Sequence, residues 1–368
     1  MEIWESKLWG IICWPLSILY RLSIKLRKYL YDLNVLSVVH LDAKIISVGN
    51  ITVGGTGKTP MVERLARLLM ENGYNIAVLS RGYRRKKKNT MIVSDRNGLK
   101  ATPEEAGDEP ILLAKKLPGI PVVVGRNRRE TGKKAAEMWK CDVLILDDGF
   151  QYMGLKKDLD LVLIDSQNPW GNGKLLPAGP LREPLSELKR AHAVVFTRVN
   201  ENRNIKASMQ RVQEIISAPI FHSVHQPSTW VSLSKGDNFP LNFLKGKKVV
   251  AFAGIGNPDS FEKSLTEIGV ETVDFIRYRD HYWYKQKDLD QLTLMAEQKG
   301  AMALVTTEKD GVRLPLLGKY KTPIYLLQIT LGIKAINKFK KLIDSVLKAP
   351  SREKEKPDGK EKNHGSRR

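Results

Sequence analysis

The sequence predicts an α/β fold with a mostly parallel sheet flanked by helices, a second, smaller α/β domain and an N-terminal amphipathic helix. Short β-branched runs alternate with segments of helical period from residue 45 to residue 199, and this alternation is typical of parallel sheets. A second series of such runs begins near residue 249. Between the two series the pattern loosens around prolines and glycines, which indicates a domain boundary.

The stretch from Ile46 to Pro60 reads ISVGNITVGGTGKTP, in the order strand, loop and helix. Its glycines allow successive N–H groups and the positive end of the helix to surround a polyphosphate. Lys58 would then reach the β- and γ-phosphates, and the hydroxyl of Thr59 would bind Mg²⁺. The alternative is a flexible turn before a helix, because Thr52 replaces the first glycine of the usual pattern. The loop predicts a P-loop NTPase-like core with these nucleotide-binding residues: Gly54, Gly55, Thr56, Gly57, Lys58 and Thr59.

The composition allows one large or two ordinary domains, because 42% of the 368 residues are hydrophobic. The two cysteines, Cys13 and Cys141, are too few for a disulfide framework or a cysteine metal cage. The net charge of +21 indicates attraction to nucleic acid, anionic lipid or a phosphorylated substrate. We predict an N-terminal membrane-surface segment 1–40, a P-loop core domain 41–227, a linker 228–248, a smaller domain 249–347 and a disordered basic tail 348–368.

The N-terminal segment contains an apolar run from Leu8 to Tyr20. It is too short to span a bilayer, which needs about 20 residues. Trp4, Trp9 and Trp14, with basic residues behind them, favour a helix that lies in the headgroup region of a membrane. The alternative is a helix packed on its own domain.

Charged residues follow several predicted strands. The basic loop that begins at Arg81 would either meet lipid or substrate phosphates or form a solvated loop only. In GDEP, Asp108 and Glu109 would either complement a helix dipole or supply a general base. Asp147 and Asp148 follow a buried strand, where a Walker-B-type aspartate would hold Mg²⁺.

The second series of strands begins with KVVAFAGIGNP. Its turn lacks the third glycine of a dinucleotide fingerprint, so we expect no such cofactor there. His281 lies further on in a polar, aromatic stretch. A lone histidine of this kind is usually structural or exposed to solvent.

With these residues in view, the chain resembles the tetraacyldisaccharide 4′-kinase family, the lipid A 4′-kinases of Gram-negative bacteria. The matching segments, in order, are VGNITVGGTGKTP, SRGYRR, GDEP, LDDGFQ, GNGKLLPAGPLREP, DHYWY and TTEKD. They cover most of the chain from Ile46 to Asp310, and Thr52 belongs to the family's form of the loop.

The resemblance implies transfer of the γ-phosphoryl group of ATP to the 4′-hydroxyl of a tetraacyldisaccharide 1-phosphate, which gives the bis-phosphorylated lipid A precursor, lipid IVA. It implies Asp108 as the base, His281 as its support and Lys58 at the phosphates. The residues implied at Mg²⁺ are Thr59, Asp147, Asp148 and Glu109. The residues implied near nucleotide are Thr52 and Gln151, and those near substrate are Arg81, Arg128, Arg182 and Glu183. The implied location is the cytoplasmic face of the bacterial inner membrane, as a peripheral protein.

Two other function classes remain open at the level of sequence. A P-loop switch with a protein partner would need purine-selective contacts, and no NKxD stretch of the usual GTPase kind is visible. A nucleic-acid-binding protein is favoured by the charge, but a clear basic motif with interleaved aromatic residues is lacking. The resemblance favours a lipid and a membrane surface as partners, and no nucleic acid.

Overall fold

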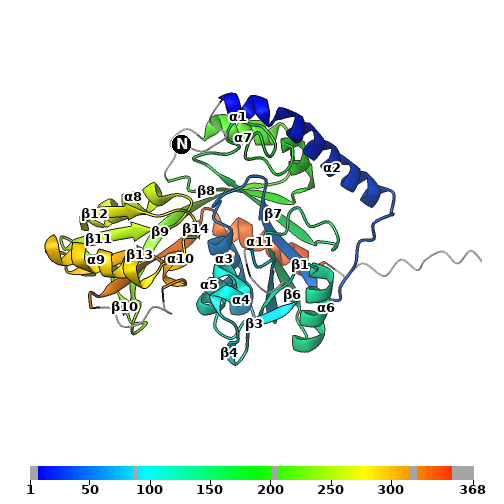
Figure 1. Cartoon of the computed structure of the whole chain (residues 1–368). Coiled ribbons are helices and arrows are strands. Elements are labelled where there is room, and N and C mark those ends of the chain that lie inside the picture. Colours follow the sequence, from blue (N-terminus) through cyan, green and yellow to red (C-terminus); the bar gives the residue numbers. More distant parts are fainter. Residues whose placement is uncertain (1–6, 84, 86–88, 201–204, 315–320, 350–368) are drawn as a thin grey trace, which may run out of the picture.

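The structure is a computed structural model that describes residues 7–83, 85, 89–200, 205–314 and 321–349 (Figure 1). Trp4, the lysines at 86–88 and the predicted basic tail from residue 350 onwards lie outside the described residues. The described chain forms two lobes and a long N-terminal helical arm.

The first lobe contains the predicted parallel sheet. Its spatial order is β8-β7-β1-β6-β2-β5-β3-β4, and all pairs from β8 to β5 are parallel. Strands β3 and β4 close one edge in antiparallel pairs. The strands are β1 (Lys44–Asn50), β2 (Ile76–Ser80), β3 (Met91–Asp95), β4 (Gly98–Leu99), β5 (Val122–Val124), β6 (Val143–Asp147), β7 (Leu159–Asp165) and β8 (Ala193–Thr197).

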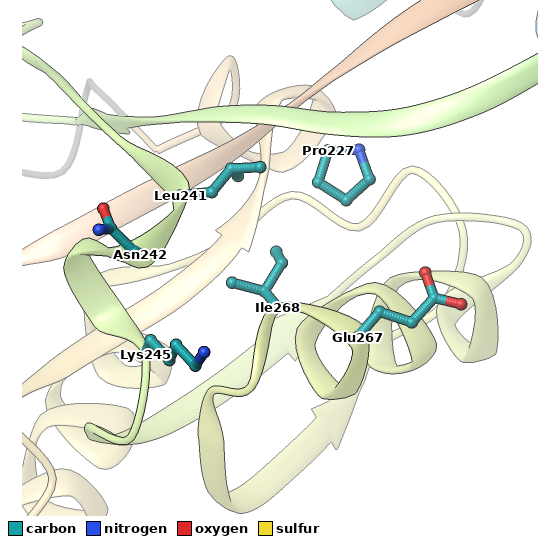
Figure 2. Close-up of a pocket in the computed structure, with 6 residues that line it drawn as sticks. All are labelled: Pro227, Leu241, Asn242, Lys245, Glu267 and Ile268. Carbon is teal, nitrogen blue, oxygen red and sulfur yellow. The ribbon is translucent and has the colours of Figure 1, made fainter.

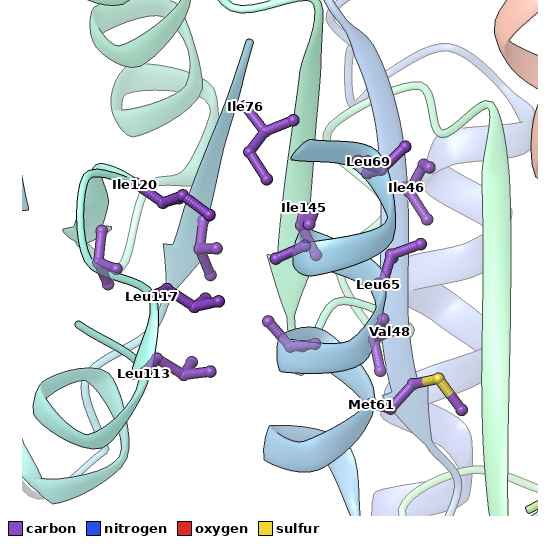
Figure 3. Packing of buried hydrophobic residues seen from close by; sticks show 14 of the residues in the cluster. Ile46, Val48, Met61, Leu65, Leu69, Ile76, Leu113, Leu117, Ile120 and Ile145 are labelled. Carbon is purple, nitrogen blue, oxygen red and sulfur yellow. The ribbon is translucent and has the colours of Figure 1, made fainter. Parts of the chain in front are cut away.

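Helices cover both faces of this sheet. Successive side chains of a strand point to opposite faces, so one strand contributes to a core cluster on each side. Ile46 of β1 packs with Leu65 and Leu69 of α3 in one core cluster (Figure 3), whereas Ile45 lies in another cluster with Ala135 of α6. The helices of this lobe are α3 (Lys58–Glu71), α4 (Pro103–Ala106), α5 (Asp108–Lys116), α6 (Arg128–Trp139), α7 (Lys206–Gln213) and the 3₁₀ helix η2 (Leu185–Arg190).

Strand β9 (Ile220–Ser232) connects the two lobes. Its first residues pair in parallel with β8, and the rest pair antiparallel with β14 (Ile324–Ile333), so one sheet runs through both lobes. The predicted linker 228–248 holds the end of β9, strand β10 (Asn238–Phe239) and the 3₁₀ helix η3 (Leu241–Leu244). Buried Trp230 anchors this segment in the core of the second lobe.

The second lobe is a smaller sheet of β12-β11-β13-β14 with helices on it, which agrees with the predicted smaller α/β unit. Strands β12, β11, β13 and β14 pair in parallel. Its elements are β11 (Lys248–Ala253), α8 (Pro258–Ile268), β12 (Glu271–Arg277), α9 (Gln286–Gln298), β13 (Ala303–Thr307) and α10 (Glu308–Gly311).

The last helix, α11 (Ile336–Lys348), packs on the first lobe, although the sequence suggested the second. Phe339 and Ile343 are buried in the first-lobe core, and the ring of Phe339 meets that of Phe221 edge-on at a centroid distance of 5.2 Å. The segment 249–347 therefore contributes to both cores.

The N-terminal arm consists of α1 (Lys7–Ile12) and α2 (Trp14–Asp32). Pro15 stands in the first turn of α2, where its missing N–H is not needed. Ser17 donates to the backbone oxygen of Leu175, and the Tyr20 hydroxyl donates to that of Arg182, which fixes the arm to the loop before η2. Among the described residues, no helix is both long and apolar enough to cross a membrane.

Phe339→Ala is expected to lower the free energy of unfolding by about 3–5 kcal/mol, because it opens a cavity in the first-lobe core. Urea denaturation measures the change. Lys340→Ala, at the exposed neighbouring position, is the control and should change stability by less than about 0.5 kcal/mol. Equal stability of the two variants would show that α11 does not belong to this core.

Candidate active site

The glycine-rich loop lies between β1 and α3, as the sequence predicts. Gly57 has a φ of +85°, in the left-handed region, and precedes Lys58 at the start of α3. A Cβ at Gly57 would lie 2.8 Å from Cε1 of His225, so this position has no room for a side chain. The Nζ of Lys58 donates to Oδ1 of Asn50 at 3.2 Å and lies 3.6 Å from Oδ1 of Asp148.

Thr52 and Gln151 support the backbone that leads into the glycine-rich loop. Thr52 is buried and forms a bridge with Leu181, in the segment that carries the LREP motif. The side-chain amide of Gln151 donates to the backbone oxygen of Asn50 at 2.9 Å. Both predicted nucleotide-binding residues therefore hold the backbone on which the phosphate loop is built.

Asp148 lies between two cations. Arg182 donates to both of its carboxylate oxygens at 2.8 Å, and Lys58 approaches from the loop. Burial alone would raise the pKa of Asp148, but the charges of Lys58 and Arg182 and the hydrogen bonds from Arg182 lower it to about 2. Asp148 also has a φ of +55°, which is strained for a residue with a side chain and is typical of functional sites.

Asp147 is buried at the end of β6 and accepts a hydrogen bond from the Ser80 hydroxyl at 2.8 Å. Burial, the charge of Glu109 and the charge of Asp148 raise the pKa of Asp147 to about 6. A buried carboxylate whose charged form is disfavoured in this way favours a bound cation, so the oxygen donors here fit Mg²⁺. Among the described residues, no group of three or more His, Cys, Asp or Glu is arranged to hold a metal ion alone, and phosphate oxygens and Thr59 would complete the shell.

Asp108 and His281 are brought together from the two lobes. Nδ1 of His281 lies 2.8 Å from Oδ2 of Asp108, across the start of α5. Gly107 has a φ of +94°, and a Cβ there would lie 2.9 Å from the backbone oxygen of Tyr83, so the AGDEP and SRGY loops pack closely. Burial alone would raise the pKa of Asp108, but the hydrogen bond from His281 and the charge of Lys309 help to lower it below its usual value.

A cleft between the lobes contains the whole glycine-rich loop, and Glu109 and Lys309 line it too. Nζ of Lys309 lies 3.1 Å from Oε1 of Glu109 and 3.5 Å from Nε2 of His281. The charge of Glu109 also acts on Asp147. The phosphate loop, the carboxylates and the Asp108–His281 pair therefore form one connected site.

The predicted substrate residues occupy different surroundings. Arg81 is exposed at the end of β2, whereas Arg128 is buried behind Asp147 and donates to its backbone oxygen at 3.4 Å. Arg182 holds Asp148, as described above. Glu183 is only 2% exposed and pairs with Arg27 of α2 at 3.3 Å and with Arg190 of η2 at 2.5 Å. A substrate would have to break these pairs to reach it.

The sequence model of the family described as tetraacyldisaccharide-1-P 4′-kinase matches residues 9–348. The chain belongs to this family. It is 44% identical to the tetraacyldisaccharide 4′-kinase of Syntrophus aciditrophicus, over 90% of this chain and 91% of that one, and 41% identical to that of Geobacter metallireducens, over 90% and 96%. It also resembles a crystal structure described as the "apo" form of LpxK from Aquifex aeolicus in complex with ATP, with a TM-score of 0.75 and 35% identity, over 92% of this chain and 99% of that chain. The predicted family and fold class are confirmed.

Sequence reasoning missed two residues of the site of this tetraacyldisaccharide 4′-kinase family member. Arg198, after β8, pairs with Asp165 and donates to the backbone oxygen of Gly55 at 2.7 Å, so it holds the loop in shape. In the sequence, the place of Arg198 directly after a buried strand could have indicated this role. His225 lies on strand β9, whose alternating pattern gives no sign of a contact with the phosphate loop.

A second hollow (Figure 2) adjoins the cleft and shares Glu267 with it. It is lined by Pro227, Leu241, Asn242, Lys245, Glu267 and Ile268. None of the predicted site residues lines this hollow, so it is not part of the candidate active site.

His225→Gln is expected to reduce the loss of folding stability that the protein shows as the pH falls. Burial and the charge of Arg198 lower the pKa of His225 to about 3 in the folded chain, whereas the unfolded chain binds a proton below about pH 6.5. The wild type should therefore lose stability relative to the variant as the pH falls from about 6.5 towards 3, by at most about 1.4 kcal/mol per pH unit, with no change above 6.5. Urea unfolding at several pH values measures this difference.

His40→Gln, at an exposed position, is the matched control for this experiment. A stability difference between wild type and His225→Gln that is the same at pH 7 and pH 4 would show that His225 is not held neutral.

Proposed function

We infer that this family member transfers the γ-phosphoryl group of ATP to the 4′-hydroxyl of a tetraacyldisaccharide 1-phosphate, giving the bis-phosphorylated lipid A precursor. Family membership over residues 9–348 supports the activity, and the related Aquifex aeolicus structure is described as a complex with ATP. The observation that carries the proposal is the Asp108–His281 pair beside a complete phosphate loop.

The loop would bind the phosphates of ATP through its backbone N–H groups and through Lys58. Of the four residues predicted at Mg²⁺, Asp148 is paired with Lys58 and Arg182. Thr59, Asp147 and Glu109 would hold the ion, which would neutralise charge on the β- and γ-phosphate oxygens. Asp148 keeps the Lys58 ammonium at the loop by its ion pair. In a loose phosphoryl-transfer transition state, such positioning and charge neutralisation supply most of the catalysis.

Asp108 would act as the base toward the sugar hydroxyl. The sugar oxygen forms a bond to the γ-phosphorus, the bond from that phosphorus to the ADP oxygen breaks, and the hydroxyl proton passes to Asp108. The lowered pKa keeps the carboxylate ionised at neutral pH, and a weak base suits a proton that leaves late. The hydrogen bond with His281 fixes the direction of the carboxylate.

The acyl chains of the acceptor would lie beside the N-terminal arm. Most of the exposed side chains described in α1 and α2 are apolar, and Trp14 is 59% exposed. The exposed large apolar residues of the arm are Trp9, Ile11, Ile12, Trp14, Leu16, Ile18, Leu19, Leu22, Leu26 and Tyr29. Together with exposed Arg21 and Lys25, they suit a membrane surface with anionic lipid. We place the protein at the cytoplasmic face of the bacterial inner membrane, as a peripheral protein.

Asp108→Asn is expected to lower the lipid kinase rate at least about tenfold, because the variant cannot accept the hydroxyl proton. ATP binding should stay nearly unchanged, since the variant leaves the phosphate loop and Lys58 intact. Thin-layer chromatography with labelled ATP and the tetraacyldisaccharide 1-phosphate measures the rate. Asp290→Asn, at an exposed position of α9, is the control.

Two outcomes of that assay would contradict the proposals separately. Wild-type turnover by Asp108→Asn would remove Asp108 from the base role. A wild-type protein that never phosphorylates this glycolipid in the presence of ATP and Mg²⁺ would overturn the activity itself.

The double variant Leu19→Glu with Leu22→Glu is expected to bind vesicles that contain anionic lipid at least about tenfold more weakly. Two leucines that leave lipid forfeit at least about 1.4 kcal/mol, and this corresponds to a factor of ten. Both side chains are more than half exposed on α2, so the fold should tolerate the change. Co-sedimentation with vesicles measures binding.

The matched control changes two exposed leucines elsewhere, in the double variant Leu99→Glu with Leu294→Glu. It carries the same charge change and should bind vesicles like the wild type. If both double variants lose binding equally, net charge explains the membrane attraction and the arm does not.

A further inference from the structure

Lys309 lies between the base and the carboxylates without a role in the mechanism above. It belongs to α10 of the second lobe, and its Nζ lies 3.1 Å from Oε1 of Glu109 and 3.5 Å from Nε2 of His281. A lysine that pairs with a carboxylate, as Lys309 does with Glu109, is an ammonium group at neutral pH.

An ammonium group has hydrogen atoms to donate and no lone pair to accept with. The nitrogen that faces Lys309, Nε2 of His281, must therefore accept in the bond between them. In the neutral ring the proton then lies on Nδ1, which donates to Oδ2 of Asp108 at 2.8 Å. The backbone N–H of Glu109 donates to the other carboxylate oxygen, Oδ1, at 3.0 Å.

Lys309 and His281 are held on the same framework of the second lobe. Buried Asp310 accepts from the backbone N–H of Gly254 at 3.0 Å and from Arg313 at 2.8 Å. The backbone oxygen of Gly254 accepts in turn from the N–H of His281 at 3.0 Å. These hydrogen bonds fix the backbones that carry the two side chains.

We propose that Lys309 is a positioning residue: by donating to Nε2 it fixes the tautomer and orientation of His281, and through His281 the direction of the Asp108 carboxylate. This role rests on the proposed function of Asp108 as the base. It also assigns a purpose to the lysine of the TTEKD segment, which comes from the opposite lobe to Asp108.

Lys309→Met is expected to lower kcat at least about tenfold while the Kd for ATP changes less than about threefold, because the carboxylate loses its direction and the phosphate loop stays intact. Lys309→Arg should recover most of kcat, since a guanidinium also donates and does not accept. Lys299→Met removes an ion-paired lysine of the same lobe, bound to Asp274 at 2.6 Å, and is the control that should keep full activity.

A side-chain ¹⁵N spectrum of histidine-labelled protein reads the tautomer directly, with His281→Gln to assign the signal. In the wild type, Nδ1 of His281 should carry the proton and Nε2 should not. In Lys309→Met the signals should show a mixture of ring forms, and Lys309→Arg should restore the wild-type pattern.

An unchanged kcat in Lys309→Met, or a loss seen only in ATP affinity, would overturn the positioning role, as would a wild-type ring protonated at Nε2. These results are separable from a failure of the proposed base. If Asp108→Asn is fully active, the base role fails, and the spectrum still shows whether Lys309 sets the ring of His281.

Discussion

Strand β9 pairs with β8 on one side and with β14 on the other, and the arrangement of the two lobes depends on this shared strand. Residues 220–222 of this strand pair with β8 and residues 223–232 pair with β14, so one continuous strand joins the two lobes. The two loops that carry Asp108 and His281, 173 positions apart in the chain, are thereby held at hydrogen-bond distance. The helix that follows β14 adds a second tie, since Phe339 returns the chain to the core of the first lobe.

Ion pairs between alternating positive and negative side chains stabilise the site between the two lobes. Lys58, Asp148 and Arg182 form one alternating series, and Lys309 and Glu109 form another. Asp147, next to them, has its own charge opposed by burial and by neighbouring carboxylates. Two cations thus pair directly with Asp148, whereas burial and the neighbouring carboxylates outweigh the charge of Lys58 at Asp147, which leaves Asp147 suited to a bound metal ion.

The sequence predicted the parts of the site that are local in the chain. A strand, a glycine run, Lys58 and a helix follow one another directly, and an aspartate pair ends a buried strand. The pairing of His281 with Asp108 came only from the family resemblance, because composition cannot tell which distant loops meet. Phe339 shows the same limit for the core: an apolar helix face predicts burial but does not say against which lobe. Trp230 shows a further limit. It is buried near the end of β9, although the prolines and glycines that follow made the sequence pattern predict a linker there.

The apolar outer face of the N-terminal arm has a consequence for the purified protein. A surface that exposes Trp14, Leu19 and their neighbours to water tends to associate with other apolar surfaces. Without lipid, copies of the chain will cover these faces against one another as the concentration rises, despite the repulsion from a charge of +21. Detergent micelles will compete for the same faces. We therefore expect the exposed apolar residues of α1 and α2 to limit the solubility of the preparation.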